Sequence, residues 1–392
     1  MSQALINRSL DLTKLQNEEY GIEICDGYLV IHHIPYLNRK KEIKSGTLVM
    51  SLTMAGNMVV KPKDHTAFFV GEQPSNLDGS FVPSLVNSAS KQKLYADIVS
   101  DFYLSCYPDG RSGYTDYYDK VTTYYSIISS PAWNLNAEKC KQIKKPIIVR
   151  ENGSSLVYMD TNASRANIAF FNVIFKSLKI AIVGLGGTGS YLLDFISKTP
   201  VSEIHLFDSD VFSTHNAFRA PGAASVDELE QELYKVEYLT KIYSHIHTGI
   251  ISHTENITQD NVSVLGYMNY VFLCVDSVNV RNSIAGYLTD NKIPFIDSGL
   301  GINLSHNNKL IGLVRITTGF NEHYSHIKDI FNGNDVKDEV YLSNIQIAEL
   351  NAMAAIYAVI KWKKMLGFYH DTFQEINSVY SIDNNDIFNE KV

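Results

Sequence analysis

Lys179-Ile-Ala-Ile-Val-Gly-Leu-Gly-Gly-Thr-Gly-Ser190 is an apolar run that breaks into a glycine-rich turn. The apolar residues predict a buried parallel strand, and the turn leads into a helix. Gly184, Gly186 and Gly189 give the spacing GxGxxG, with Gly187 as an additional glycine. Backbone N–H groups at such a turn can approach a phosphate at the start of a helix. The stretch therefore predicts a nucleotide site near the middle of the chain, without deciding which nucleotide.

The composition is typical of a well-cored globular protein. The 392 residues exceed the length of a usual single domain, and 45% of them are hydrophobic while 19% are charged. The formal net charge is −8 and no polybasic run is present, so nucleic acid and anionic membranes are not expected partners. The sequence has no signal-peptide pattern and no apolar run of transmembrane length. The four cysteines form no CxxC pair, so we expect a cytoplasmic protein without structural zinc.

The two parts of the chain differ in pattern, which predicts two domains. Residues 1–155 contain β-type runs separated by turn-prone clusters, followed by a helical stretch from Tyr114 to Ile128, and predict an α+β domain of uncertain role. Residues 160–392 alternate strand and helix, which predicts an α/β domain with a Rossmann-like, mostly parallel sheet. The strands expected there span residues 179–183, 203–207, 270–275 and 294–297. The helices expected there span residues 190–198, about 226–247 and 279–290.

Charged residues follow the expected strands of the second domain. Asp208 ends the second strand, 24 residues after Gly184. In a doubly wound sheet that position meets ribose hydroxyls. Asn216 and Arg219 come shortly after it, and a guanidinium there suits phosphates better than a neutral nicotinamide ring. Lys235 opens the next expected helix and offers a second cation.

Two further carboxylates complete the expected site. Asp276 lies at the carboxyl end of another strand, where a carboxylate can hold Mg²⁺. Asp210 is open to three interpretations: it orients the loop, assists the Mg²⁺, or caps a turn. Two cations, a Mg²⁺-type carboxylate and a glycine loop suit charge neutralisation on a nucleoside triphosphate.

These motifs together resemble the ThiF/MoeB and ubiquitin-activating enzyme superfamily. The resemblance covers residues of about 165–370, and the motifs are Gly184-Leu-Gly-Gly-Thr-Gly-Ser190, Asp208-x-Asp210 with Asn216 and Arg219, Lys235-Val-Glu237, and Asp276-Ser-Val-Asn-Val-Arg-Asn282. It implies an adenylyltransferase that uses ATP and Mg²⁺ to activate the C-terminal glycine of a ubiquitin-like protein, commonly as a homodimer.

The resemblance also implies a role for each matching residue. The nucleotide-binding residues are Gly184, Gly186, Gly187, Gly189, Asp208, Asp210 and Asn216, with Asp208 on the ribose. Arg219 and Lys235 hold the phosphates, and Asp276 coordinates Mg²⁺. Arg165 is the candidate for an arginine that reaches the γ-phosphate, often from the other subunit of the dimer.

The chain departs from the family pattern in its cysteines. Many relatives have a thioester-forming cysteine in a crossover segment, which we expect at residues 315–326, and that segment contains none. Three alternatives stay open. The acyl-adenylate passes directly to a partner, or a hydroxyl of Thr317, Thr318 or Ser325 accepts the acyl group as an oxyester, or Cys106 accepts it. The first two are favoured over Cys106.

The N-terminal domain offers a weaker resemblance. Residues 64–74 resemble a strand and turn of ubiquitin-conjugating folds, and the composite layout looks like bacterial proteins from ubiquitin-like conjugation operons. This context implies a ubiquitin-like protein as substrate and a conjugating enzyme as a further partner. Two competing hypotheses are an NAD-dependent oxidoreductase and a non-catalytic scaffold that binds a ubiquitin-like protein.

Overall fold

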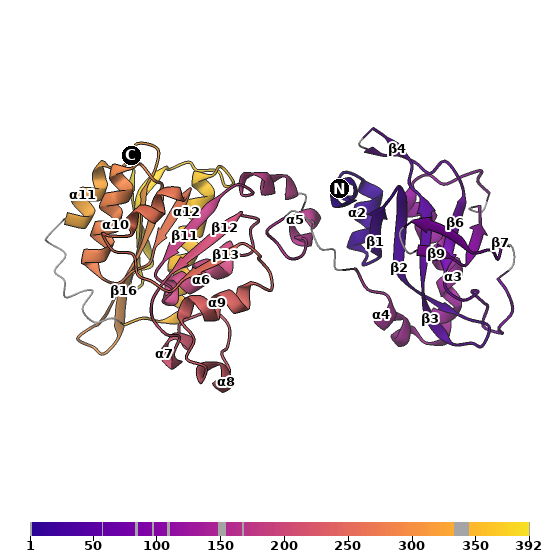
Figure 1. Cartoon of the computed structure of the whole chain (residues 1–392), viewed down its shortest axis with the longest axis horizontal. Coiled ribbons are helices and arrows are strands. Elements are labelled where there is room, and N and C mark those ends of the chain that lie inside the picture. Colours follow the sequence, from indigo (N-terminus) through magenta and orange to yellow (C-terminus); the bar gives the residue numbers. More distant parts are fainter. Residues whose placement is uncertain are drawn as a thin grey trace. The chain divides into compact units, whose positions relative to one another are not determined.

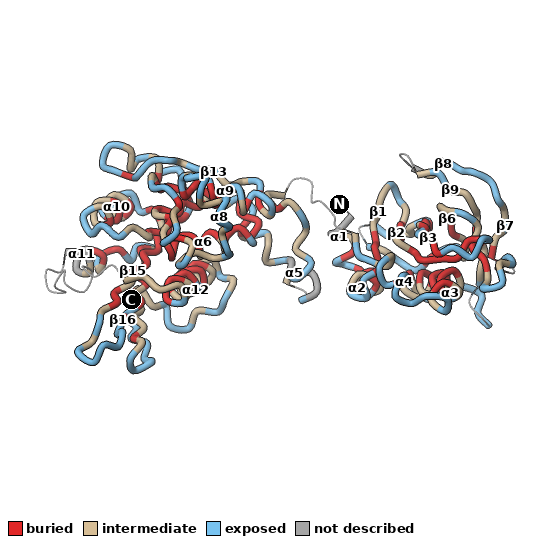
Figure 2. Tube along the Cα trace, turned by 90° about the horizontal axis from the view of Figure 1, so that it is seen from below, coloured by how far each residue is buried: buried red, intermediate tan, exposed pale blue. Residues whose placement is uncertain are grey.

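A computed structural model describes residues 2–391 except 57, 83–84, 96–97, 108–109, 148–153, 167 and 333–344. The chain divides into two compact units (Figure 1). Unit 1 comprises Met1–Val149 and Asp160–Ala169, and unit 2 comprises Arg150–Met159 and Phe170–Val392. Each unit has a buried core of its own, drawn in red in Figure 2. Among the described residues, no helix is long and apolar enough to span a bilayer.

Unit 1 is built on an antiparallel sheet. Its strands are β1 (Gly21–Cys25), β2 (Tyr28–Leu37), β3 (Ile43–Ser51), β6 (Thr66–Val70), β7 (Val86–Ser88) and β10 (Phe102–Ser105). In the described residues they lie in the order β1-β2-β3-β6-β10-β7, each antiparallel to its neighbour. Two separate ribbons pair β4 (Met54–Ala55) with β5 (Met58–Val59) and β8 (Gln92–Tyr95) with β9 (Ile98–Ser100).

The helices of unit 1 are α1 (Ser2–Asn7), α2 (Leu10–Asn17), α3 (Tyr117–Leu135), α4 (Ala137–Ile143) and α5 (Thr161–Arg165). The carboxylate of Asp116 caps the long helix α3. Tyr117, Val121, Tyr124 and Ile128 recur at helical spacing and are buried in the core against the sheet, so one face of α3 closes that core.

Tyrosine hydroxyls of α3 also bind the ends of the strands. The Tyr117 hydroxyl donates to the Ser51 carbonyl at 2.7 Å, and the Tyr124 hydroxyl accepts the N–H of Cys106 at 2.9 Å. The Tyr114 hydroxyl, just before the helix, donates to the Cys106 carbonyl at 2.8 Å. These bonds satisfy backbone groups that the sheet leaves unpaired at its ends.

Unit 2 contains one large mixed sheet. Its strands are β11 (Lys179–Val183), β12 (Glu203–Phe207), β13 (Ile250–His253), β14 (Tyr270–Leu273), β15 (Phe295–Leu304), β16 (Leu310–Gly319), β17 (Glu375–Ser381) and β18 (Asp386–Lys391). In the described residues their order is β13-β12-β11-β14-β15-β16-β17-β18. The first five run parallel, and β15 to β18 pair antiparallel. The carboxyl ends of the parallel strands therefore meet at one edge.

Helices cover both faces of this sheet. They are α6 (Gly187–Ile196), α7 (Thr214–Ala217), α8 (Val226–Leu229), α9 (Lys235–Tyr243), α10 (Val278–Asp290), α11 (Ser325–Asn332) and α12 (Ala348–Met365), with 3₁₀ turns η1 (Ala169–Ile174) and η2 (Val262–Tyr267). One core joins Ile182 of β11 to α6, α9 and α12. A second core joins Val183 of the same strand to η2, α10 and α11. Neighbouring strand residues point to opposite faces, so the central strands are apolar throughout.

The expected Rossmann-like sheet is confirmed, and three local expectations are wrong. Helix α6 begins at Gly187 and not at Ser190, because the glycine turn already forms its first turn. The single helix expected over about 226–247 is two short helices, separated where Glu232 adopts a left-handed conformation (φ 49°). Residues 315–319, expected in a crossover segment, belong to strand β16.

Candidate functional site

The glycine turn joins β11 to α6, and two of its glycines are required by close packing. Gly184 has φ +91°, and a Cβ there would lie 2.7 Å from the carbonyl oxygen of Cys274 on the neighbouring strand's end. A Cβ on Gly189 would overlap the carbonyl oxygen of Gly184. Both positions therefore exclude larger residues on steric grounds alone.

The other two glycines differ in what they face. A Cβ on Gly186 would meet no atom within 4 Å, whereas a Cβ on Gly187 would overlap the side chain of Asn351 on α12. Asn351 also accepts a hydrogen bond from the Thr188 hydroxyl at 3.0 Å. The backbone at Gly186, at the start of α6, is thus open to a ligand, while Gly187 allows α12 to approach closely. Such an open helix start fits a phosphate group.

Asp208 stabilises this turn by hydrogen bonds. It follows β12 and is 7% exposed. Its carboxylate accepts the N–H of Leu185 at 2.7 Å with one oxygen and the N–H of Asp210 at 2.9 Å with the other. Two backbone donors fix the carboxylate at the carboxyl edge of the sheet, where a ribose would lie in a doubly wound fold.

Lys235 and Arg219 bring positive charge to the same edge. Lys235, the first residue of α9, lies 2.5 Å from an oxygen of Asp210 and 3.3 Å from an oxygen of Asp208. Burial lowers the pKa of Arg219, and the neighbouring carboxylates of Asp276, Asp208 and Asp210 oppose this shift. The sequence-predicted cations and carboxylates therefore form one cluster.

Unpartnered polar atoms remain in this cluster. Within the described residues, the Nδ2 of Asn216 and the Nε of Arg219 are buried without a hydrogen-bond acceptor. The Oδ1 of Asn216 is used by a capping box with Ser213 at the start of α7. Buried donors without acceptors are costly, and anionic oxygens of a ligand would satisfy them. The residues therefore fit a nucleotide.

Asp276 is exposed at the end of β14, and buried charges hold the segment before it. Arg281 of α10 donates to the carbonyl of Val275 at 2.6 Å. Its Nε lies 3.1 Å from Asp297, a wholly buried carboxylate that Arg315 contacts at 3.0 Å from the other side. Asp297, Arg315 and Asn351 were missed by sequence reasoning. The only signal was a polar residue inside an apolar pattern.

A small cavity of about 80 Å³ opens between the glycine turn and β15. Its lining residues are Gly186, Gly187, Thr188, Cys274, Val275, Asp276, Arg281, Ser298, Leu300, Ile302, Ile345, Gln346 and Asn351. Among the described residues, no three His, Cys, Asp or Glu side chains converge to hold a metal ion. A Mg²⁺ ion would fit here only through Asp276 together with phosphate oxygens, which is how Mg²⁺ is commonly bound.

The candidate acyl acceptors of unit 2 differ in their exposure. Thr317 is wholly buried and donates to Asn377 at 2.9 Å, and Thr318 is 3% exposed and donates to the Ile376 carbonyl. The Thr317 hydroxyl is therefore not presented to a substrate, whereas Thr318 lies on the wall of the larger cavity described below. Ser325 is exposed at the start of α11. Burial raises the pKa of the Cys274 thiol, which disfavours its thiolate.

The side chain of Arg165 lies outside the described residues, so its expected contact with the γ-phosphate stays a prediction.

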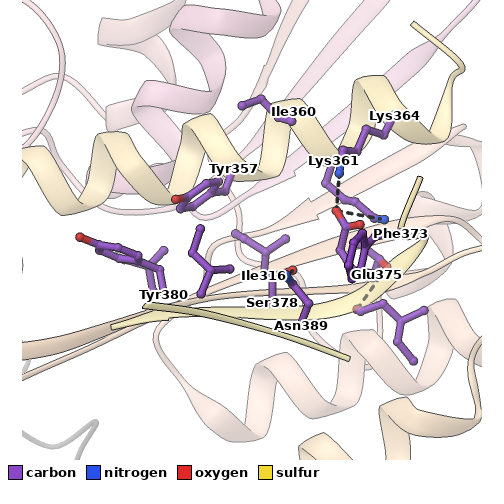
Figure 3. Close-up of a pocket in the computed structure, with 14 residues that line it drawn as sticks. Ile316, Tyr357, Ile360, Lys361, Lys364, Phe373, Glu375, Ser378, Tyr380 and Asn389 are labelled. Atoms are coloured by element: carbon purple, nitrogen blue, oxygen red, sulfur yellow. Dashed lines mark hydrogen bonds and ion pairs between the residues drawn. The ribbon is translucent and has the colours of Figure 1, made fainter. Parts of the chain in front are cut away.

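A larger cavity lies elsewhere in unit 2, between α12 and strands β16 to β18 (Figure 3). Its volume is about 270 Å³. Tyr357, Ile360 and Tyr380 line its apolar part, and Lys361 lies at its polar end. It contains none of the predicted nucleotide-binding residues. We call it the α12 groove.

Two family models match the chain. A model of the ThiF family matches residues 165–387, which is more than half of the chain. A model described as a domain of unknown function (DUF6791) matches residues 10–161. The second description names no activity, so the resemblance of unit 1 to ubiquitin-conjugating folds stays a prediction.

Curated relatives and solved structures are more distant. The tRNA threonylcarbamoyladenosine dehydratase of Escherichia coli (strain K12) is 28% identical over 130 residues, which cover 32% of this chain and 47% of that protein. The adenylyltransferase and sulfurtransferase UBA4 of Saccharomyces cerevisiae (strain RM11-1a) is 26% identical over 178 residues, 44% of this chain and 36% of that protein. The chain thus spans less than half the length of both. The crystal structure of E. coli MccB with succinimide matches at 18% identity and a TM-score of 0.46, over 57% of this chain and 67% of that one.

Proposed function

The chain belongs to the ThiF family, and from this premise we propose that unit 2 transfers the adenylyl group of ATP to a substrate carboxylate. The observation that supports this most is the cluster at the carboxyl edge of the sheet. Asp208 accepts a hydrogen bond from the glycine turn and pairs with Lys235. The carboxylates of Asp276 and Asp208 attract the guanidinium of Arg219 electrostatically. Two cations and an exposed carboxylate thus lie near one helix start, an arrangement that suits the binding of phosphates.

The proposed reaction needs no protein nucleophile. A carboxylate oxygen of the substrate attacks the α-phosphorus of ATP in line, the bond to the bridging oxygen breaks, and pyrophosphate leaves. The attacking carboxylate is ionised at neutral pH, so no general base is required. Arg219 and Lys235 stabilise negative charge on the triphosphate, and Asp208 orients the ribose. Asp276 would hold a Mg²⁺ ion, which supplies further positive charge when bound.

For the substrate, we propose the C-terminal carboxylate of a ubiquitin-like protein in a bacterial conjugation pathway, with a conjugating enzyme as a second partner. The support for this substrate is the family resemblance, and the name of the UBA4 relative, an adenylyltransferase and sulfurtransferase, supports the adenylation step. The other relative is named for a modified tRNA nucleoside, so a carboxylate on RNA is the alternative that the test below must exclude.

We further propose that the acyl-adenylate is passed directly to a partner nucleophile. The burial of Thr317 and Thr318 and the raised pKa of Cys274 support this. Ser325 and the half-buried Cys106 of unit 1 are the remaining candidates. Mass mapping of a trapped adduct, with hydroxylamine to cleave thioesters, decides among them. The family resemblance also favours a homodimer in the cytoplasm, and light scattering of the purified chain tests the dimer.

ATP–pyrophosphate exchange tests the activity. The full chain is incubated with ATP, Mg²⁺, labelled pyrophosphate and candidate ubiquitin-like proteins that end in glycine. We expect exchange that requires the free C-terminus, and a loss of about 10²-fold or more in Arg219→Ala and Asp276→Ala. Glu322→Gln, which removes a carboxylate from an exposed ion pair with Lys292, is the matched control and should retain exchange.

Absence of exchange with every protein substrate, combined with exchange on a modified tRNA, would overturn the substrate proposal and keep the adenylation. Exchange that survives in Arg219→Ala would contradict the assignment of the site.

A further inference from the structure

The candidate nucleotide site has as many negative as positive side chains. The carboxylates of Asp208, Asp210 and Asp276 are set against the cations Arg219 and Lys235. Arg281, which lines the adjoining cavity with Asp276, brings the cations to three, so the site has no excess of positive charge for a ligand. An anion-binding site with this balance is unusual, because the triphosphate itself is strongly negative.

A neighbouring histidine does not correct the balance. Burial lowers the pKa of His215, and the cations Arg219 and Lys235 lower it further, while Asp210 acts in the opposite direction. The lowered pKa disfavours the protonated form of His215, so this residue adds no fixed positive charge to the site.

Asp210 differs from the other two carboxylates in its contacts. Asp208 is buried and bonded to the glycine turn, whereas the side chain of Asp210 is 69% exposed. Its strongest contact is Lys235, at 2.5 Å. The backbone fixes this pair, because the N–H of Lys235 donates to the Asp210 carbonyl at 2.8 Å and a β-bridge joins Val211 to Tyr234. Asp210 thus neutralises the cation that the phosphates need.

The two forms of a triphosphate meet this pair differently. A metal-free triphosphate must compete with Asp210 for the ammonium of Lys235, and it also meets three carboxylates. A triphosphate complexed with a divalent cation has less net negative charge, and its cation is attracted by the same carboxylates. Asp210 therefore penalises the first form more than the second.

We propose that Asp210 is a specificity residue that makes the site select metal-complexed triphosphates over metal-free ones. The inference rests on the proposed function, since it requires that the cluster binds a nucleotide. It assigns to Asp210 a role that is distinct from binding the metal. Asp210 pairs with the ammonium of Lys235, and the exposed Asp276 is the carboxylate that would bind the divalent cation.

Equilibrium binding tests the proposal without turnover. Calorimetry measures the affinity of the full chain for ATP with EDTA, for ATP with Mg²⁺, and for AMP. We expect Asp210→Asn to raise the affinity for metal-free ATP about tenfold, which corresponds to roughly 1.4 kcal/mol, and to leave the affinities for Mg²⁺-ATP and AMP nearly unchanged. Asp210→Glu keeps the charge and should keep the discrimination.

The outcomes separate the possible roles of Asp210. An unchanged ratio of the two ATP affinities in Asp210→Asn, with intact folding by thermal unfolding, would overturn the inference alone. A collapse of Mg²⁺-ATP binding would also overturn it, because Asp210 would then be a metal ligand. If the wild-type chain bound no nucleotide in either form, the proposed function itself would fail. Glu322→Gln, at an exposed ion pair with Lys292, should change none of the three affinities.

Discussion

Two cavities among those of unit 2 differ in size and in chemistry. The cavity at the glycine turn has a volume of about 80 Å³, and the α12 groove has about 270 Å³. A nearly buried lysine paired with two carboxylates lies near each cavity. Lys235 pairs with Asp208 and Asp210 beside the glycine turn, and Lys361, which lines the α12 groove, pairs with Asp371 and Glu375. Of the two, it is Lys235 that lies beside the open helix start at Gly186 and near the unpartnered donors of Asn216 and Arg219. Size therefore does not identify the site, and the surroundings of the charges do.

The largest expected effect on activity comes from replacing one of the two lysines by methionine. Lys235→Met should lower ATP–pyrophosphate exchange by about 10²- to 10³-fold, because a cation on the triphosphate is lost. Lys361→Met removes a lysine of similar burial and should leave the exchange per folded molecule near that of the wild type. The measurement is kcat/KM on samples matched for folded fraction by circular dichroism. Equal losses in both variants would erase the functional difference between the cavities.

Gly186 and Gly187, at the start of α6, should differ in whether an added methyl group affects ligand binding or stability. Gly187→Ala should destabilise unit 2 by about 2 kcal/mol, because its Cβ overlaps Asn351, and Asn351→Ala in the same chain should recover much of that loss. Gly186→Ala should unfold like the wild type and weaken ATP binding, since its Cβ points into open space. Urea unfolding and calorimetry measure the two effects. A stability loss in Gly186→Ala would show that the turn has no open side.

The smallest expected effect is a loss of stability at acidic pH. It depends on a histidine in the interior of unit 2 and not on the charged cluster at the glycine turn. His247 is wholly buried, its Nε2–H donates to the Val201 carbonyl at 3.0 Å, and its Nδ1 accepts the N–H of Gly249 at 3.1 Å. Both nitrogens are satisfied only in the neutral form, and burial lowers the pKa of His247 below its usual 6.5. The unfolded chain therefore binds more protons, so stability is fully present above pH 6.5 and falls as the pH drops towards the folded pKa.

His247→Gln should cost about 1 kcal/mol at pH 7.5 and flatten the decline of stability between pH 6.5 and pH 5. Urea unfolding at several pH values measures the slope. A decline as steep as that of the wild type would assign the acid sensitivity to other groups.

Sequence reasoning worked best where function depends on local spacing. The strand, the glycine turn and the polar residues after β12 and β14 are each encoded within about a dozen residues, so the nucleotide edge could be predicted. Contacts between distant segments could not. Gly187 lies against Asn351, although 163 residues separate them in the sequence. Asp297 of β15 forms ion pairs with Arg281 of α10 and Arg315 of β16.

The error over residues 315–326 has a specific cause. Residues 311–318 are rich in β-branched side chains, a pattern that favours a strand, whereas the family resemblance implies a crossover segment there. Antiparallel pairing with β15 and β17 then buries Thr317 and Thr318. The two short helices α8 and α9 were missed because a left-handed residue such as Glu232 has no reliable sequence signal outside glycine and asparagine.

The path of the chain between the units has a practical consequence for exchanging parts of this protein. Unit 2 includes residues 150–159, and the described portion of that stretch is bonded to it: Val157 N–H donates to the Ile246 carbonyl, Thr248 N–H donates to the Ser155 carbonyl, and Leu156 bridges to His247. A chimera that joins another N-terminal domain at residue 160 would discard these bonds and expose the backbone beside the buried histidine. A junction before residue 154 would retain them, so the transplantable module begins ahead of the boundary that a linker-like sequence suggests.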